Sequence, residues 1–387
     1  MGRGMTNDEE SRPFDYLIIG SGAAGLLLGA EFLSRARLRR KRIGVVDDGS
    51  FPLRGRGWGY WTDQHRPVDE LAESEWTTLD VFANGECRQL DLTPYRYCYV
   101  RAEALSEWLR SASEAADVTW IADRIERVPS NKDGAVAVGR SAEYNASWVF
   151  DSRPPLGGLD GSIRLHFLGW EIATAMSAFS PDVATFMDFR LGVDGRVQFG
   201  YVLPQSPTSA LVELASFTSG PWDHERASHD LAAYVSDVLD IPNWSVTRNE
   251  FGDLPLIVGP SDTASDRVVA IGRSGGLLRA STGYGFDRMM RHARQIADGL
   301  EAGATDASSL RFAESRRQTY LDRVLLDVVT AEPEMIEPTF AALFARNPPT
   351  RILRFLDGDS SRRDEARIVM SMPKSPFLRA ARRVASS

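Results

Sequence analysis

The clearest hydrophobic pattern of the chain lies close to its start. A short apolar run, Tyr16–Ile19, leads into the glycine-rich segment Gly20–Gly25 and then into a helical stretch. A second apolar run, Ile43–Val46, ends at the acidic residue Asp47. Short apolar runs of this kind are typical of parallel strands that are buried on both faces. The pattern therefore predicts a strand, a tight turn, a helix and a second strand.

This order of elements matches the fingerprint of a dinucleotide-binding unit. We expect Gly20 to make the turn, Gly22 to leave room for a pyrophosphate, and Gly25 to let the helix pack closely. The helix N-terminus would face the phosphates, and Asp47 would accept hydrogen bonds from ribose hydroxyls. The cofactor-binding residues predicted in this unit are Gly20, Ser21, Gly22, Ala23, Ala24, Gly25 and Asp47. The alternative is a tight turn that holds no ligand.

Farther along the chain the pattern changes twice. Residues 164–217 alternate in the manner of antiparallel strands, with a hairpin whose loop is Pro204–Ser209. Trp148–Asp151 and Val268–Gly272 again predict buried strands of the parallel kind. Helical spacing is found in residues 99–110, 227–239, 286–300 and most of 306–387.

These elements predict an α/β fold: a Rossmann-type FAD-binding domain of the glutathione-reductase or hydroxylase kind, an inserted antiparallel β-sheet substrate domain and a helical C-terminal region. The FAD-binding domain is expected to be discontinuous. The predicted boundaries are 1–13 for a disordered tail, 14–67, 98–155 and 265–305 for the FAD-binding domain, 68–97 and 156–264 for the substrate domain, and 306–387 for the C-terminal helices.

Composition excludes several classes of function. The 387 residues carry a net charge of −8, which argues against a nucleic-acid partner. Only Cys87 and Cys98 occur, without the spacing of metal ligands, so we expect no metal and a reduced, cytoplasmic compartment. No apolar run is long enough to cross a membrane, and the first residues lack the pattern of a signal peptide.

A series of short segments carries a resemblance to a known family. They include VFDSRP, HFLGW, VATFMDFR, FGYVLPQSPTSALVE and ASTGYGF. Their positions, in one order along the chain, are Val149–Pro154, His166–Trp170, Val183–Arg190, Phe199–Glu213, Glu250–Pro255, Gly275–Phe286, Asp322–Leu326, Phe355–Asp357 and Pro373–Ala380. They resemble the flavin-dependent lycopene β-cyclase family of bacterial type. The chain departs from the family pattern at Gly55, Leu214 and Arg273, which bears on the substrate more than on the chemistry.

The resemblance implies an isomerase that requires FAD in its reduced form. A proton adds to a terminal double bond of lycopene, the cation closes a β-ionone ring, and another proton leaves without net redox change. Burying an unpaired cation is costly. An anionic reduced flavin about 4 Å away would offset roughly 4 kcal/mol at an effective dielectric of about 20. The flavin is thus expected to act through its charge, with NAD(P)H or another donor as its reductant.

The resemblance and the strand pattern together nominate Glu213 as the proton donor. In a strand, Leu211, Glu213, Ala215 and Phe217 share one face, and apolar neighbours keep a carboxyl protonated. The alternative is an exposed or arginine-paired edge glutamate. Glu250 is expected to be a second acid or, preferably, a structural partner.

Further site residues are implied by the matching motifs. The additional cofactor-binding residues are Arg56, Gly272, Gly275, Gly276, Thr282 and Gly283. The aromatic residues expected to line the substrate are Trp58, Trp61, His166, Trp170, Phe189 and Tyr201. For each of these aromatic residues, the alternative is an ordinary place in the core.

The expected partner is an apolar polyene. Lys374, Arg379, Arg382 and Arg383, interleaved with apolar residues, predict a basic amphipathic helix that docks peripherally on the inner face of the membrane. A solvated terminal helix is the alternative. Rival functions are cyclisation of another polyene or prenylated natural product, an FAD monooxygenase or dehydrogenase, and a non-catalytic flavin-binding protein.

Overall fold

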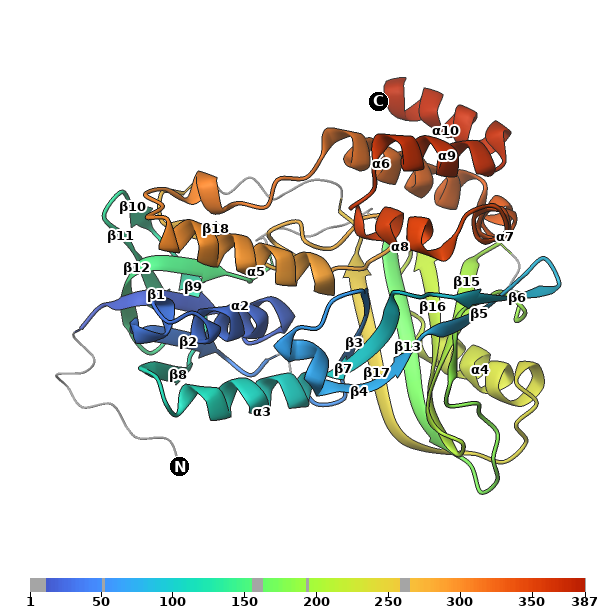
Figure 1. Cartoon of the computed structure of the whole chain (residues 1–387), viewed down its shortest axis with the longest axis horizontal. Helices are drawn as coiled ribbons and strands as arrows, with labels where there is room; N and C mark the ends of the chain where they lie inside the picture. Colours follow the sequence, from blue (N-terminus) through green and yellow to red (C-terminus); the bar gives the residue numbers. More distant parts are fainter. Residues whose placement is uncertain (1–11, 51–52, 155–162, 193–194, 258–264, 387) are drawn as a thin grey trace.

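The computed structural model describes residues 12–50, 53–154, 163–192, 195–257 and 265–386. These residues form three β-sheets and a set of C-terminal helices. Figure 1 shows the first sheet and its helices at one end of the molecule and the second sheet at the other. The C-terminal helices lie against the second sheet. The predicted tail of residues 1–13 falls almost entirely outside the described residues.

The first sheet is built around the N-terminal strand. Five of its strands run parallel: β18 (Val268–Ala270), β12 (Glu143–Asp151), β1 (Phe14–Ile19), β2 (Ile43–Asp47) and β8 (Val118–Ala122). The antiparallel strands β9 (Ile125–Arg127), β10 (Ser130–Asn131) and β11 (Gly134–Gly139) extend it beside β12. The helices α2 (Ala23–Ser34), α3 (Ala102–Ser113) and α5 (Phe286–Glu301) accompany this half of the molecule. The predicted strand, turn, helix and strand are confirmed.

The second sheet has seven strands and two differently covered faces. Their order is β17 (Ser245–Pro255), β13 (Arg164–Ala173), β16 (Ser209–Thr218), β15 (Val197–Ser206), β14 (Val183–Asp188), β5 (Thr78–Ala83) and β6 (Glu86–Asp91). All neighbouring pairs are antiparallel except β14 and β5. Helix α4 (His224–Ala233) packs on one face, and the C-terminal helices share a hydrophobic core with the other.

A three-stranded sheet completes the middle of the chain. Its order is β3 (Gly57–Thr62), β7 (Arg96–Arg101) and β4 (Ala72–Trp76). Strand β4, from the range predicted for the substrate domain, pairs with β7, whose second half lies in the range predicted for the FAD-binding domain. The proposed domain boundaries therefore cut through this small sheet.

The C-terminal region is helical, as the spacing predicts. It consists of α6 (Arg316–Ala331), α7 (Ile336–Arg346), α8 (Pro349–Asp357), α9 (Arg362–Ser371) and α10 (Lys374–Ser386). Their apolar residues join those of the second sheet in one hydrophobic core. Among the described helices, none combines the length and apolar character needed to cross a membrane.

Three element boundaries differ from the predictions. Helix α3 begins at Ala102, because the preceding residues from Arg96 belong to strand β7. The hairpin loop predicted at residues 204–209 shrinks to Pro207 and Thr208, because the ladder of β15 and β16 continues to Ser206 and Ser209. Helix α4 begins three residues before 227 and passes into a π-helical turn, Tyr234–Val238.

Candidate active site

The turn from β1 into α2 has the shape that a bound phosphate group needs. Gly20 has φ of +95°, and a Cβ there would lie 2.1 Å from Ser152 Oγ. A Cβ on Gly25 would lie 2.0 Å from the Gly20 carbonyl oxygen. Around Gly22, by contrast, a Cβ would meet nothing within 4 Å, and no side chain caps the helix that starts after it. The backbone N–H groups of the first turn therefore face open space.

Asp47 lies beside this turn. Its carboxylate accepts hydrogen bonds from Ser21 N (2.6 Å) and Ser21 Oγ (2.8 Å) through Oδ2, and from Gly49 N (2.8 Å) through Oδ1. The acid at the end of β2 is thus tied to the glycine-rich turn. Its predicted contact with a ribose stays a prediction.

The loops after β12 and β18 meet the same edge of the first sheet. Ser152 donates a hydrogen bond to Ile19 O (2.7 Å), and a Cβ on Gly272 would lie 3.0 Å from Ala24 Cβ. Farther along the second loop, a Cβ on Gly283 would lie 2.7 Å from Leu165 Cδ2 in the second sheet. Glycines at these positions allow close approach of the backbone. The loop that carries the predicted cofactor residues therefore runs from the first sheet, at Gly272, to the second sheet, at Gly283; the residues are Gly272, Gly275, Gly276, Thr282 and Gly283.

Two arginines approach the end of this space. Burial lowers the pKa of Arg56, while the charge of Glu250 raises it and that of Arg273 lowers it. Burial also lowers the pKa of Arg273. A Cβ on Gly55 would lie 3.1 Å from the Asn249 carbonyl oxygen, so this loop packs on β17. Arg56 thus links the region of the predicted cofactor to a glutamate in the second sheet.

Glu213 and Glu250 meet across a glycine. Gly169 in β13 pairs with Glu213 of β16 on one side and with Glu250 of β17 on the other. Directly opposite residues in a sheet point to the same face. A Cβ on Gly169 would lie 3.1 Å from Glu250 Cγ and 3.4 Å from Glu213 Oε2. The absence of a side chain at residue 169 leaves the space in which the two carboxyl groups form a hydrogen bond.

The pair holds a proton near neutral pH. Burial, the charge of Glu250 and the hydrogen bond to it raise the pKa of Glu213 well above 4.5. Burial raises the pKa of Glu250 to about 7, whereas Arg248 and the hydrogen bond with Glu213 lower it. A hydrogen bond between two buried carboxyl groups requires that one of them carries a proton. Tyr99 Oη donates a weaker bond to Glu250 Oε2 (3.4 Å). The pair can thus serve as a source of one proton near neutral pH.

Aromatic rings enclose the Glu213 side of the pair. Tyr201 is its cross-strand neighbour on β15, and the Tyr201 and Tyr284 hydroxyls are 2.9 Å apart. Trp61 packs edge-on against Tyr284, with ring centroids 4.8 Å apart. We call this group the aromatic cage; its members are Trp61, Tyr97, Phe186, Tyr201 and Tyr284. Ring faces stabilise a nearby cation.

The structure does not bring all the predicted aromatic residues to this cage. His166 and Trp170 lie on the opposite face of the second sheet, against Trp222 and Trp244, because they alternate with Gly169 along β13. Trp58 stacks on Phe286 of α5, on the other face of the small sheet from Trp61. Phe189 packs on Phe199 and Phe340. Phe199 in turn packs on Tyr201, so the Phe199 ring lies between Phe189 and the cage. Only Trp61 and Tyr201 of the predicted set join Glu213.

The site residues predicted from the sequence do not include Gly169, and for Glu250 the preferred prediction is a structural role. Gly169 belongs to the segment HFLGW. Strand alternation places Gly169 on the same face as Glu213, whereas His166 and Trp170 lie on the other face. Of the two roles expected for Glu250, second acid or structural partner, its register against Gly169 favours the less preferred one, a second carboxyl at the site. Asp188 and Arg190, two residues apart on and after β14, form an ion pair with several hydrogen bonds.

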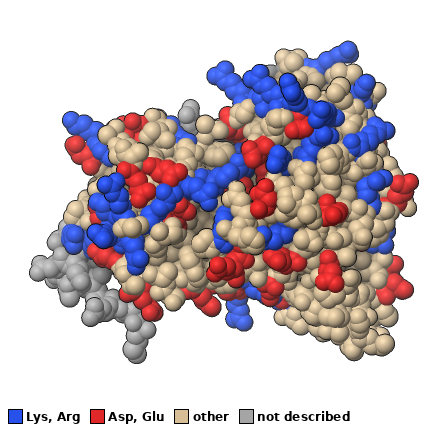
Figure 2. Space-filling model, in the orientation of Figure 1, with Lys and Arg blue, Asp and Glu red and all other residues tan. Residues whose placement is uncertain are grey.

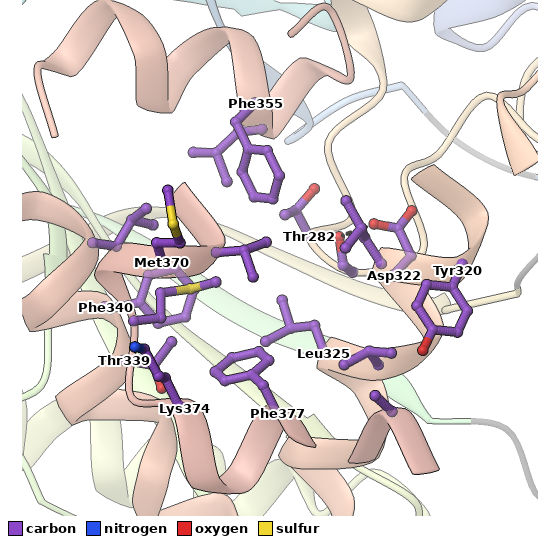
Figure 3. Close-up of a pocket in the computed structure, with 18 of the residues that line it drawn as sticks. Thr282, Tyr320, Asp322, Leu325, Thr339, Phe340, Phe355, Met370, Lys374 and Phe377 are labelled. Atoms are coloured by element: carbon purple, nitrogen blue, oxygen red, sulfur yellow. Dashed lines mark hydrogen bonds between the residues drawn. The ribbon is translucent and has the colours of Figure 1, made fainter. Parts of the chain in front are cut away.

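A separate apolar cavity of about 350 Å³ lies among the C-terminal helices. Its inner end is formed by Thr282 and by Asp322, which accepts hydrogen bonds from Arg279 (3.0 Å) and Ser281 (2.7 Å). Figure 3 shows Phe340, Phe355 and Phe377 around the space. A predicted cofactor residue, Thr282, therefore borders this cavity as well.

Comparison with known proteins decides the family. The sequence model described as lycopene cyclase protein matches residues 15–382. The chain belongs to the lycopene cyclase family. This confirms the predicted resemblance.

Relatives within the lycopene cyclase family are distant in sequence. The lycopene beta-cyclase of a Paracoccus species is 24% identical over 390 residues, covering 95% of this chain and 96% of that protein. The chloroplastic lycopene beta cyclase of an Oncidium hybrid cultivar is 24% identical and covers 75% of this chain and 64% of that protein. The capsanthin/capsorubin synthase of Citrus sinensis is 23% identical, and the match covers 74% of this chain and 60% of that protein. The match thus spans less than two thirds of these two plant proteins.

Solved structures confirm the fold of this lycopene cyclase family member. A geranylgeranyl bacteriochlorophyll reductase-like protein of Thermoplasma acidophilum has a TM-score of 0.62 at 12% identity, covering 96% of this chain and 99% of that one. A variant of Klebsiella pneumoniae HpxO, solved with FAD, has a TM-score of 0.62 at 15% identity, covering 93% and 99%. The predicted Rossmann-type domain with an inserted sheet is the fold of this chain.

Proposed function

We propose that this lycopene cyclase family member closes the acyclic end of lycopene into a β-ionone ring, as an isomerase without net redox change. The observation that carries this proposal is the carboxyl pair: Glu213 holds a proton beside the aromatic cage. Adding a proton to an alkene needs an acid that stays protonated at neutral pH. It also needs surroundings that tolerate a cation, and rings provide them.

The cofactor in this proposal is FAD. Gly22 leaves open space before the uncapped N-terminus of α2, where a phosphate fits, and the loops of residues 272–283 provide room for close approach. The residues that would hold the cofactor are Gly20, Ser21, Gly22, Ala23, Ala24, Gly25, Asp47, Arg56, Gly272, Gly275, Gly276, Thr282 and Gly283. Bound FAD in its reduced, anionic form supplies negative charge near the developing cation. NAD(P)H or another donor would reduce it.

The protein's own residues handle the proton. Glu213 gives its proton to the terminal double bond of the polyene and becomes a carboxylate. Glu250, its hydrogen-bonded partner, favours the proton on Glu213 between turnovers because its negative charge raises that pKa. When the ring closes, the proton lost from the neighbouring carbon returns to the carboxyl pair, so that protons balance over one turnover.

The aromatic cage holds the reacting end and keeps water away. Trp61 and Tyr284 meet edge to face, and Phe186 packs parallel to Tyr284 with centroids 6.2 Å apart. Trp61 is 2% exposed, so its ring is shielded from water. A cation that met water would give an alcohol in place of the ring, so exclusion of water directs the outcome.

An anaerobic assay tests the proposal. Purified protein is incubated with FAD, a chemical reductant and lycopene in detergent micelles, beside Glu213→Gln and the exposed control Glu143→Gln. We expect a cyclic product of unchanged mass, and a loss of about 100- to 10,000-fold in rate for Glu213→Gln alone. An oxygenated or dehydrogenated product would overturn the proposal in favour of an FAD monooxygenase or dehydrogenase.

Cyclisation of another polyene or prenylated compound is the second candidate. The family departures Gly55 and Arg273 favour it, because both lie near the Arg56 and Glu250 end of the site. This candidate keeps Glu213 and FAD in their roles and changes the substrate alone. Wild-type protein that binds reduced FAD, leaves lycopene unchanged and cyclises another polyene would select it.

A further inference from the structure

The cavity among the C-terminal helices opens through an apolar mouth. Its walls come from α6, α7, α8, α9 and α10, with Leu325, Phe340 and Phe377 facing one another (Figure 3). Ligand sites are typically about 300–1,000 Å³ and mainly apolar, and the volume of about 350 Å³ falls in that range. The size and lining suit a hydrocarbon chain.

Exposed hydrophobic residues gather at this mouth. Four side chains that line the cavity are exposed to solvent: Tyr320 (41%), Val369 (41%), Met370 (64%) and Leu378 (59%). They come from α6, α9 and α10, so three helices contribute to one apolar rim. Single exposed hydrophobic residues are ordinary, whereas a cluster around an opening marks an interaction surface.

Basic residues are frequent on α9 and α10, two of the helices that form the rim. Residues 362–386 carry seven Lys or Arg and two Asp or Glu, in a chain whose net charge is −8. Figure 2 shows Lys and Arg gathered over the C-terminal helices. Within the described part of the chain, Lys374, Arg382, Arg362 and Arg363 are exposed and form no ion pair. These cations remain available for an external anion.

Two of the basic residues that the sequence predicts at the membrane surface form ion pairs within the protein. Arg379 pairs with Glu332, and Arg383 pairs with Asp327 at 2.5 Å. Both acidic partners belong to α6 or follow it, so these arginines fasten α10 onto the helix that forms the opposite wall of the cavity. Truncating α10 would therefore disturb the fold, and point variants are the better test.

The inner end of the cavity lies behind the aromatic cage. Phe340, in the cavity wall, is 6.3 Å from Phe344, whose ring is 6.2 Å from Phe186 of the cage. Thr282 borders the cavity, and its Oγ1 accepts a hydrogen bond from Tyr284 N (3.3 Å). Packed rings thus connect the wall of the cavity with the aromatic cage.

We propose that the rim formed by α6, α9 and α10 docks on an anionic lipid bilayer, and that the cavity behind it admits the apolar chain of the substrate from that bilayer. The docking part rests on the rim and its cations alone; the substrate part rests on the function proposed above. Apolar side chains insert into the acyl region while Lys and Arg contact anionic headgroups. A protein partner would not need an open hydrocarbon cavity at the centre of its interface.

Vesicle flotation of the full-length protein tests the docking. Vesicles of phosphatidylcholine, with or without phosphatidylglycerol, are the probe. We expect wild type to bind the anionic vesicles, and Lys374→Gln with Arg382→Gln to bind about 30-fold more weakly, because each basic residue near the surface contributes about fivefold. Met370→Asp with Leu378→Asp should lose binding too. The matched controls, Arg37→Gln with Arg39→Gln and Met176→Asp, alter exposed residues elsewhere and should bind like wild type.

Failure of wild type to float, or equal binding by the rim variants and wild type, would overturn the docking.

Ala381→Trp tests the cavity, because Ala381 lines it while Ala385, the control position on the same helix, does not. We expect Ala381→Trp to bind vesicles normally and to lose turnover of vesicle-borne lycopene, whereas Ala385→Trp keeps both. Unchanged turnover in Ala381→Trp would refute the cavity as the route. If no form of the protein converted lycopene, the proposed function would fail while the flotation result still stood.

Discussion

The carboxyl pair beside Gly169 carries a cost in folding free energy that grows with pH. Burial raises the pKa of Glu250 from 4.5 to about 7. Below pH 4.5 the group is neutral in both the folded and the unfolded protein. As the pH rises, the unfolded chain ionises first, and stability falls until the pH passes the folded pKa. At about 1.36 kcal/mol per pH unit, the loss across this window is about 3 kcal/mol.

Replacement of Glu250 by glutamine removes this cost, because glutamine does not ionise. We expect the free energy of unfolding of Glu250→Gln to rise relative to wild type by about 3 kcal/mol between pH 4.5 and pH 7, with no further change above that. Urea denaturation at a series of pH values measures the difference. Glu143→Gln, at the exposed start of β12, is the control and should follow the wild-type curve.

Parallel stability curves for wild type and Glu250→Gln would refute this reasoning. They would mean that folding leaves the Glu250 carboxyl as easy to ionise as it is in the unfolded chain. Glu213 would then lose the neighbouring charge that helps to keep it protonated, and its assignment as the proton donor would lose its physical basis.

Three further predictions test other parts of the site. Gly169→Ala places a Cβ 3.1 Å from Glu250 Cγ and Leu211 Cδ1, so we expect turnover to fall about 10- to 100-fold. Gly220→Ala, whose Cβ meets nothing closer than 3.6 Å, should leave turnover unchanged. A Cβ at Gly22 meets no protein atom within 4 Å, so Gly22→Ala should keep the melting temperature of wild type while weakening FAD binding in a fluorescence titration; unchanged binding would contradict the phosphate site. Trp61→Phe should slow turnover about 2- to 30-fold through weaker stabilisation of the cation, whereas Trp170→Phe, on the other face of the sheet, should not; equal effects would place the substrate elsewhere.

The sequence predicts the first sheet well because its signals are local. The glycine-rich turn, the apolar strands on either side of it and the late strand at Val268 each depend on neighbours in the chain, and the structure confirms them. Tyr99, at the start of a predicted helix, instead extends strand β7, because pairing with β3 and β4 outweighs its helical spacing. That pairing depends on residues distant in sequence.

The site was harder to predict, because it depends on register between distant strands. Glu213 follows from its own strand, whereas Glu250 becomes its partner only through the pairing of both with Gly169. Alternation along β13 places His166 and Trp170 on the face opposite to Gly169, and this part of the arrangement is visible in the sequence alone. Trp58 and Trp61 separate for the same reason on β3.

The loop after β18 connects two parts of the molecule that the chain builds separately. Gly272 touches the start of α2, and Gly283 touches Leu165 in the second sheet. A ligand that orders this loop adds its binding free energy to the folded state of both sheets at once. We therefore expect a bound cofactor to couple the folding of the two halves. A substitution in the second sheet that shifts Leu165 would weaken cofactor binding at a distance, without any change in the residues that touch the cofactor.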